Sequence, residues 1–190
     1  MTFIIACTTE EGVDPLFCCS HRQVELLDYN INLLVGLIGR CPSCARNLRV
    51  VFCSMSCDPH QSKYLSPNET LDYVTPGGEN LTLITALNYH ISETYVQGLY
   101  NSCIEVVNPS SNSLALPTYC GSWGEDCNAH RLFDSMGLSV DNGGFSPFDI
   151  YFDYAYDGET PPEGVVPFDP TAIACYEPIN VSQLQISIIQ

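Results

Sequence analysis

The cysteine content constrains this chain more than any other feature of its sequence. Eleven cysteines are spread over 190 residues, so at least one has no partner within the chain. They occupy the following positions: Cys7, Cys18, Cys19, Cys41, Cys44, Cys53, Cys57, Cys103, Cys120, Cys127 and Cys175. In an oxidising compartment this density indicates a disulfide framework, whereas in the cytosol it would suggest metal ligation. Three N-glycosylation sequons, at Asn68, Asn80 and Asn180, favour the oxidising compartment and predict a glycoprotein.

Charge and length narrow the class of protein further. Twenty-two acidic residues against six basic ones give a net charge of −16, which argues against a nucleic-acid or anionic-lipid surface. A hydrophobic fraction of 45% is enough for a core, and we expect residues 1–190 to form one domain. No run approaches the roughly 20 apolar residues that cross a bilayer. The segment from Met1 to Cys7 is too short for a signal peptide, and we expect a truncated piece of a larger secreted or luminal protein.

Apolar periodicity predicts helices in the first half of the chain. Apolar residues recur there at steps of three and four, as in Val24, Leu27 and Ile31, which indicates one face of a helix. Pro42 separates the first two helices, because the residue before a proline avoids helical geometry. The predicted segments are a helix over about Cys18–Ile38, a helix over Pro42–Cys57, a loop over Asp58–Asn80 and a helix over Leu81–Val107.

The second half is dominated by turn-forming residues as far as Gly144, where Cys120 and Cys127 close a short loop. Apolar and polar residues then alternate strictly over Phe148–Tyr156, which predicts a half-buried strand. The other predicted segments are a short helix over His130–Met136, a linker over Thr160–Pro170 and a last strand over Leu184–Ile188. Together these elements predict an α+β fold, with a disulfide-stapled helical core and a small mixed β-sheet.

Cys41 and Cys44 form a CxxC pair at the start of the second predicted helix, a position that lowers a thiol pKa and suits redox catalysis. The pair lacks the preceding buried strand of a thioredoxin-like unit and sits among nine other cysteines, so we favour structural disulfides. Zinc binding would need further ligands, which Cys53 and Cys57 or His60 could supply. Because the sequons indicate a compartment where thiols oxidise, we expect no metal site.

Catalytic motifs are absent from the sequence. The histidines do not form a metal motif such as HExxH, and there is no GxSxG elbow, phosphate-binding glycine loop or dinucleotide fingerprint. Asp149 and Asp153 lie on the polar face of the predicted strand and are expected to be solvated. We therefore expect a chain that is not an enzyme, with no catalytic residues and no cofactor.

Gln23, Leu27 and Asn30 lie at positions i, i+4 and i+7 of the first predicted helix, so two amides share a face with apolar residues. The pattern alone favours amides at the solvent edge. The alternative is a mostly apolar cavity with a few placed hydrogen-bonding groups, the design of a lipid or sterol pocket.

Spaced motifs along residues 7–150 resemble a known family. The motifs are Cys18-Cys19-x-x-Arg22-Gln23, Arg40-Cys41-Pro42-Ser43-Cys44-x-x-Asn47-Leu48, Phe52-Cys53-x-x-x-Cys57-x-Pro59-x-Gln61-Ser62, Asp72-Tyr73-Val74, Tyr100-Asn101-x-Cys103, Pro109-Ser110-Ser111-Asn112, Cys120-Gly121, Cys127-Asn128, Asp141-Asn142-Gly143 and Pro147-Phe148. Their order and spacing resemble the N-terminal luminal domain of the Niemann-Pick type C sterol transporters, the large membrane-bound proteins of that name. Residues 157–190 resemble it poorly.

The resemblance implies a deep apolar pocket that binds cholesterol or a related sterol. Gln23 would bond the sterol hydroxyl, with Asn30 close by on the same helix. The further wall positions implied are Leu27, Asn47, Tyr89, Leu99, Tyr100, Phe148 and Ile150. The implied mouth, where sterol passes to or from a carrier, comprises Thr118, Tyr119, Asn128, Pro147 and Phe148. The resemblance also implies hand-over with the small soluble Niemann-Pick type C protein, in the lumen of late endosomes and lysosomes.

The same resemblance implies a set of disulfides. The implied pairs are Cys7–Cys53, Cys19–Cys57, Cys44–Cys103 and Cys120–Cys127. Cys18, Cys41 and Cys175 resemble cysteines whose partners lie in terminal segments that this chain lacks. They are expected to be free, to pair with one another, or to mark an incomplete gene model.

Two further classes of function stay open on the sequence. One is a secreted disulfide-rich module that binds another small ligand, such as a vitamin. Trp123 is the only tryptophan and bases number six, which disfavours a flat heteroaromatic ligand with carboxylates. The other is a module that binds a protein partner and whose interior is filled by side chains. A secreted hydrolase ranks last because no nucleophile motif is present.

Overall fold

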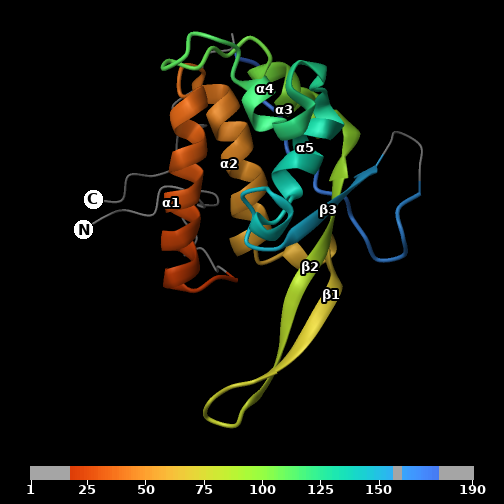
Figure 1. Cartoon of the computed structure of the whole chain (residues 1–190). Coiled ribbons are helices and arrows are strands. Elements are labelled where there is room, and N and C mark those ends of the chain that lie inside the picture. The colour runs from red at the N-terminus through yellow and green to blue at the C-terminus, as the bar shows by residue number, and fades with distance from the viewer. Residues whose placement is uncertain (1–17, 156–159, 176–190) are drawn as a thin grey trace, which may run out of the picture. The chain divides into compact units, whose positions relative to one another are not determined.

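The computed structural model describes residues 18–155 and 160–175 (Figure 1). Contacts divide these residues into two compact units. The first unit comprises residues 18–61, 97–116 and 170–175, and the second comprises residues 62–96, 117–155 and 160–169.

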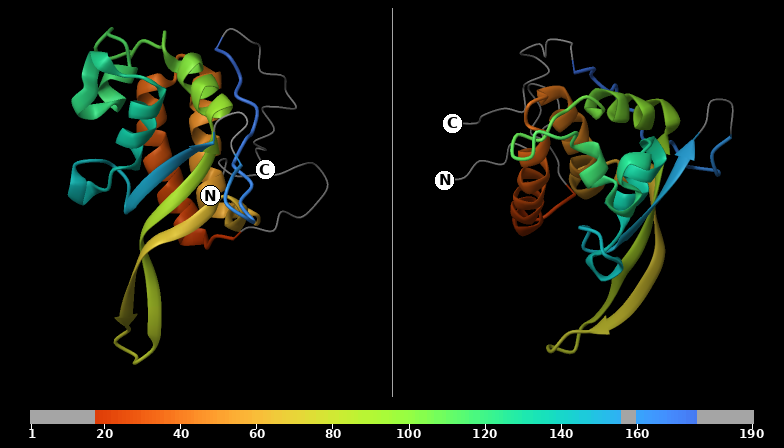
Figure 2. Two further views of the ribbon diagram at one scale, coloured as in Figure 1. Left: turned by 90° about the vertical axis from the view of Figure 1, so that its right-hand side faces the viewer. Right: turned by 45° about the horizontal axis from the view of Figure 1, so that its top comes forward.

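Two helices dominate the first unit. Helix α1 (His21–Ile38) and helix α2 (Pro42–Cys57) lie side by side and antiparallel, as Figures 1 and 2 both show. Val24, Ile31 and Ile38 form the buried face of α1, at the spacing that the sequence predicts. Pro42 is the first residue of α2, where its missing N–H costs no hydrogen bond. The predictions for these two helices are confirmed.

The prediction of one long helix over Leu81–Val107 is wrong. Residues Asn80–Ser92 form strand β2, and helix α3 runs only over Glu93–Cys103. The alternating residues Leu87, Tyr89 and Ile91 are buried, so this segment buries a strand face. The helix begins where the Ser92 hydroxyl accepts a hydrogen bond of 3.0 Å from the N–H of Tyr95, as an N-cap does.

The expected loop over Asp58–Asn80 is also wrong. It contains the 3-10 helix η1 (Gln61–Lys63) and strand β1 (Leu65–Val74). The three-stranded sheet has the order β1-β2-β3, with β1 antiparallel and β3 (Asp149–Ala155) parallel to β2. The mixed sheet of an α+β fold is thus confirmed. Pro67 is tolerated because β1 is an edge strand.

Strand β3 pairs only with Ala86–Ser92 of β2, so the rest of the β1–β2 hairpin extends past it (Figure 1). Leu71 pairs with Leu83, and Tyr73 pairs with Leu81. Partners and alternate residues of a strand share a face, so these four side chains form one apolar face, which is 42–56% exposed.

The second unit packs helix α5 (Ala129–Gly137) on strand β3, as Figure 2 shows. The helix predicted around His130–Met136 is confirmed, and it is longer by one residue at each end. Its last residue, Gly137, makes the close approach possible, because a Cβ there would lie 2.2 Å from the carbonyl oxygen of Ile150. The shorter helical segments are α4 (Leu116–Tyr119) and the 3-10 helices η2 (Gly121–Asp126) and η3 (Val140–Asn142).

The expected linker over Thr160–Pro170 takes part in the core of the second unit. The Val166 N–H donates a hydrogen bond of 2.9 Å to the carbonyl of Lys63. Phe168 is buried and packs against the rings of Tyr64, Tyr89 and Tyr95. Proline and polar content suggested a solvated segment, whereas one aromatic side chain anchors it. The predicted last strand, Leu184–Ile188, lies outside the described residues.

Disulfides staple both units. The bonds are Cys19–Cys57, Cys41–Cys175 and Cys44–Cys103 in the first unit and Cys120–Cys127 in the second. Three of them are pairs that the family resemblance implies. The bond between Cys41 and Cys175 is one of the alternatives left open for these two cysteines, that they pair with one another. The fourth implied pair includes Cys7, which lies outside the described residues. Cys18 has no disulfide partner among the residues described. None of the described helices is long and apolar enough to span a membrane.

Candidate ligand-binding site

Helix α1 presents an unusual exposed face. Gln23, Leu26, Asn30 and Leu33 follow one another at steps of three and four, which places them on one side of the helix. Leu26 is 54% exposed and Leu33 is 59% exposed, and both amides are exposed beside them. Leu27, the apolar position singled out from the sequence, is half-buried at the border of this face. An apolar surface with a few placed amides is the composition of a small-molecule site.

Gln23 occupies the N3 position of α1 and completes a capping box with Ser20. Its Oε1 accepts hydrogen bonds from the Ser20 N–H at 2.8 Å and from the Ser20 hydroxyl at 2.9 Å. The Ser20 Oγ in turn accepts the N–H of Gln23 at 3.3 Å. The motif Ser-x-x-Gln before an apolar run is readable in the sequence and could have shown this role of Gln23.

Gln23 and Asn30 share a face but not a position along the helix. Seven residues at about 1.5 Å each separate their backbones by about 10 Å along the axis. The two amides therefore reach different parts of any ligand that lies along α1, and a single hydroxyl does not bridge them.

Asn47 is fully buried, and its polar atoms bond to the first unit's own chain. Its Nδ2 donates to the Ser102 hydroxyl at 3.0 Å and to the carbonyl of Ile173 at 2.9 Å. Its Oδ1 accepts the Ile173 N–H at 3.1 Å. Asn47 thus holds residues around Ile173 against α2, a role with no local signal in the sequence because Ile173 is far along the chain. The other expected wall positions of this unit lie on α3, where Leu99 is buried and Tyr100 is half-buried.

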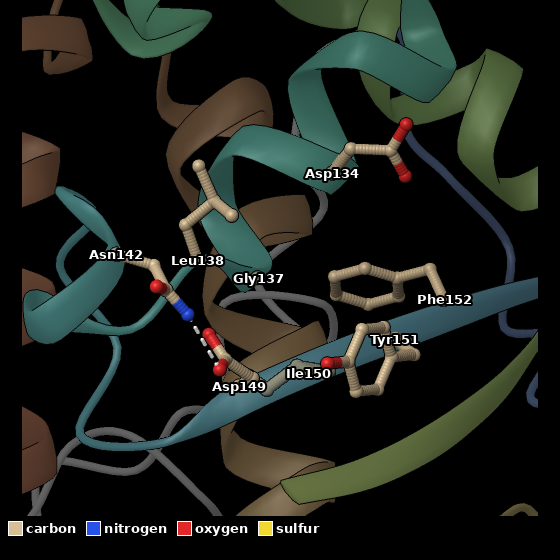
Figure 3. A pocket seen from close by; sticks show the side chains of 8 residues that line it. All are labelled: Asp134, Gly137, Leu138, Asn142, Asp149, Ile150, Tyr151 and Phe152. Atoms are coloured by element: carbon tan, nitrogen blue, oxygen red, sulfur yellow. Dashed lines mark hydrogen bonds between the residues drawn. The ribbon is translucent and has the colours of Figure 1, made fainter.

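The second unit holds a pocket of about 300 Å³ between the end of α5 and strand β3 (Figure 3). Eight residues line it: Asp134, Gly137, Leu138, Asn142, Asp149, Ile150, Tyr151 and Phe152. Ile150 is the one expected wall residue among them. The volume of this pocket lies at the lower end of the range of ligand pockets.

Two other expected wall residues of this unit lie outside that lining. Tyr89 is fully buried and stacks on Tyr64 and Phe152. Phe148 is half-buried next to the start of β3.

The carboxylate of Asp149 places a negative charge at one end of this pocket. Its Oδ1 accepts the Ser139 N–H at 2.8 Å, and its Oδ2 accepts the Asn142 amide at 2.8 Å (Figure 3). The hydrogen bond from the Ser139 backbone, followed by that from Asn142, lowers the pKa of Asp149 below its ordinary value. The carboxylate therefore connects the loop after α5 to the start of β3.

The five residues expected at a pocket mouth all belong to the second unit. Thr118, Asn128 and Pro147 are exposed. Tyr119 is buried, and burial raises the pKa of its phenol. Asn128 is also the N-cap of α5, where its Oδ1 accepts the N–H of Arg131 at 2.9 Å.

Histidines of the second unit pair with carboxylates. His90 Nδ1 lies 2.7 Å from Asp153 Oδ2, and His130 Nε2 lies 2.7 Å from Glu93 Oε2. Within the described residues, no group of three or more His, Cys, Asp or Glu side chains is placed to hold a metal ion.

These features define a disulfide-stapled α+β module with an amide-bearing apolar helix face. The family model described as "Niemann-Pick C1 N terminus" matches residues 2–185, and the chain belongs to this family. As a member of it, the chain is a non-catalytic domain.

Curated relatives support the assignment. The NPC intracellular cholesterol transporter 1 of Sus scrofa is 35% identical over 164 residues, which cover 86% of this chain. The NPC1-like intracellular cholesterol transporter 1 of Mus musculus is 31% identical over 166 residues, again 86% of this chain. The NPC intracellular cholesterol transporter 1 homolog 1b of Drosophila melanogaster is 29% identical over 153 residues, or 79% of this chain. The chain spans 12% of the length of each of these relatives.

Proposed function

We propose that this chain binds cholesterol or a related sterol and takes part in intracellular sterol transport. The observation that carries the proposal is the family match over residues 2–185. Its relatives in pig, mouse and fly are named cholesterol transporters, and about a third of the aligned residues are identical to them.

The α1 face supports this proposal on physical grounds. A sterol is an apolar body with one hydroxyl, and sheltering apolar surface from water contributes about 25 cal/mol per Å². Leu26 and Leu33 supply apolar surface that is otherwise in water. The hydroxyl needs a partner once it is buried, and the neutral amide of Gln23 supplies one without burying a charge.

The proposed site follows the resemblance residue by residue. The sterol contacts proposed from the resemblance are Gln23, Leu27, Asn30, Tyr89, Leu99, Tyr100, Phe148 and Ile150. The exposed face of α1 adds Leu26 and Leu33 to them. Asn47 supports the site through its bonds to Ser102 and Ile173. The proposed mouth comprises Thr118, Tyr119, Asn128, Pro147 and Phe148.

The proposal extends to a partner and a compartment. Sterol would pass to or from the small soluble Niemann-Pick type C protein, in the lumen of late endosomes or lysosomes. The N-glycosylation sequons at Asn68, Asn80 and Asn180 fit a luminal chain. A transfer assay from the sterol-loaded soluble protein tests the partner, with absence of transfer as the contrary result.

Equilibrium binding of labelled cholesterol to the oxidised, delipidated protein tests the function. Gln23→Ala is expected to weaken binding by about 1–3 kcal/mol, because the buried hydroxyl loses its partner. Asn32→Ala is the matched control, since Asn32 lies on the opposite side of α1 and bonds Arg49. No saturable binding by a folded, disulfide-bonded protein contradicts the function, and unchanged affinity in Gln23→Ala removes Gln23 from the site.

A further inference from the structure

The pocket of the second unit combines carboxylates with apolar walls, a lining unlike the neutral amides of α1 (Figure 3). We propose that this pocket binds a small organic cation, a protonated amine on an apolar body, with the ammonium group at the carboxylate of Asp149. Such a site goes beyond the proposed sterol function, because a sterol carries no charge.

Asp149 begins β3, where its carboxylate is held in place but is not neutralised. Its Oδ1 accepts the N–H of Ser139 at 2.8 Å, and its Oδ2 accepts the amide of Asn142 at 2.8 Å. Each carboxylate oxygen has two lone pairs, so each keeps one acceptor position for a ligand. The two donors are neutral and lower the pKa of Asp149, so the group keeps its negative charge in mildly acidic solution.

Asp134 adds a second carboxylate to the lining, from helix α5. Its Oδ1 accepts the hydroxyl of Tyr154 at 2.7 Å, which is again a neutral donor. Within residues 18–155 and 160–175, neither Asp134 nor Asp149 takes part in an ion pair. The pocket therefore carries two negative charges that hydrogen bonds position and no cation of the described chain offsets.

The basic residues of the second unit are Lys63 and Arg131, and neither lines the pocket. The Arg131 guanidinium lies 4.3 Å from the centroid of the Trp123 ring, and its Nη1 donates to the carbonyl of Asp126. Uncompensated carboxylates in a concave site attract a cation, because low-dielectric walls focus the electric field.

Most of the remaining lining is apolar. Leu138 and Ile150 contribute aliphatic surface, and Tyr151 and Phe152 contribute aromatic rings (Figure 3). Leu138 is 42% exposed and Tyr151 is 50% exposed, so an apolar ligand would remove their surface from water. A ring face also attracts an ammonium group that lies within about 6 Å of its centre.

These walls favour an organic cation over a hydrated inorganic ion. In the part of the chain that the structure describes, no group of three or more metal-ligating side chains is placed to hold a metal ion. The volume of about 300 Å³ suits a small ligand.

Three ligands with the same phenylethyl body test the charge class. They are 2-phenylethylammonium, the neutral 2-phenylethanol and the anionic 3-phenylpropionate. NMR titration of the isotope-labelled, oxidised chain measures their dissociation constants and shows which backbone amides shift. We expect saturable binding of the amine with shifts at Gly137 and Asn142, binding of the alcohol at least about tenfold weaker, and no binding of the anion.

Asp149→Asn and Asp134→Asn each remove one charge with little change in shape. We expect the affinity ratio of amine to alcohol to fall about tenfold in Asp149→Asn, because charge-assisted hydrogen bonds are the stronger ones. The ratio should fall about threefold in Asp134→Asn, because Asp134 is exposed. A loss of folded protein lowers both affinities alike and cancels in the ratio.

Asp72→Asn is the matched control. Asp72 is an exposed carboxylate of the β1–β2 hairpin that accepts the hydroxyl of Thr82 at 3.1 Å and lies outside the lining. We expect this variant to keep the ratio of amine to alcohol within about twofold of the unsubstituted protein.

A lysine side chain of another protein can present the same ammonium group, so Nα-acetyl-lysine amide is the fourth probe. It lacks the apolar body, and we expect it to bind at least about threefold more weakly than 2-phenylethylammonium. Equal or tighter binding of the lysine amide would assign the pocket to a partner's side chain and overturn its assignment to a free amine.

The remaining outcomes decide the cation site itself. Equal affinities of amine and alcohol, no saturable binding of the amine, or amine-induced shifts on α1 instead of the pocket would each overturn it. An unchanged ratio in Asp149→Asn would overturn the role of that carboxylate. Labelled cholesterol measures sterol binding separately, so a protein that binds cholesterol but no amine loses this site and keeps the proposed function.

Discussion

The structural role of an amide side chain in this protein depends on the residues that surround it. Gln23 is exposed and holds the first turn of α1, whereas Asn47 is buried and bonds a distant part of its own unit. Both residues were singled out from the sequence as ligand contacts. Both side chains carry the same amide group, so only the residues around each one distinguish the two roles.

Asn47→Ala is expected to lower the free energy of unfolding by about 1–3 kcal/mol. The substitution leaves the Ser102 hydroxyl and the backbone of Ile173 without partners in a buried place. Urea unfolding measures the change. Asn30→Ala, which removes an exposed amide, serves as the control and should change stability little; equal effects of the two substitutions would contradict the role given to Asn47.

Asp149 predicts a dependence of stability on pH. Because its pKa is lowered below the ordinary 3.8 in the folded state, its stabilising effect is present above that value and is lost as pH falls through the folded pKa. The stability difference between the unsubstituted protein and Asp149→Asn should therefore be largest near neutral pH and shrink in acid. Urea unfolding across pH measures it, and a difference independent of pH would argue against the two hydrogen bonds as its cause.

At the scale of elements, close packing between α5 and β3 depends on one glycine. Gly137→Ala should destabilise the protein, because its Cβ would lie 2.2 Å from the Ile150 carbonyl oxygen and force the helix away from the strand. Gly36→Ala is the matched control, since Gly36 is exposed in the last turn of α1 and a Cβ there meets nothing within 4 Å. We expect the control to stabilise by about 0.5–1 kcal/mol.

Thermal unfolding of the two glycine variants checks the contrast. A melting temperature that falls for Gly137→Ala and rises slightly for Gly36→Ala is the expected result. If both variants rise, then α5 and β3 tolerate a wider separation than their contact indicates.

The elements also show why periodicity predicted some segments and not others. Helix α1 buries one face along its whole length, so the spacing of Val24, Ile31 and Ile38 reports its structure. The segment Asn80–Ser92 begins as an exposed hairpin arm and ends in the core, so its apolar residues fit neither period throughout. Strand β1 has no buried residue, which removes the alternation that would have predicted it.

At the scale of the whole molecule, the disulfides differ in how much they restrict the unfolded chain. Cys41–Cys175 joins residues 134 apart, whereas Cys120–Cys127 joins residues 7 apart. The chain-entropy relation predicts that removing the first bond costs about 2.5 kcal/mol more than removing the second.

Paired alanine variants of each bond and denaturant unfolding measure this difference. Equal losses for the two pairs would mean that the restriction of the unfolded chain is not the main source of the stabilisation. The family assignment does not depend on that outcome, since it rests on the match over residues 2–185.

The sequence by itself determined the α+β class, the first two helices, α5, β3 and the family. Each depends on information that is local or repeated at a fixed spacing, such as an apolar period, a cap or a run of cysteine motifs. The tertiary structure alone decided that Asn80–Ser92 is a strand, that Asn47 holds Ile173 and that Cys41 pairs with Cys175. These features join residues that are far apart in the chain. Their burial and their hydrogen-bond and disulfide partners are set only when the chain folds.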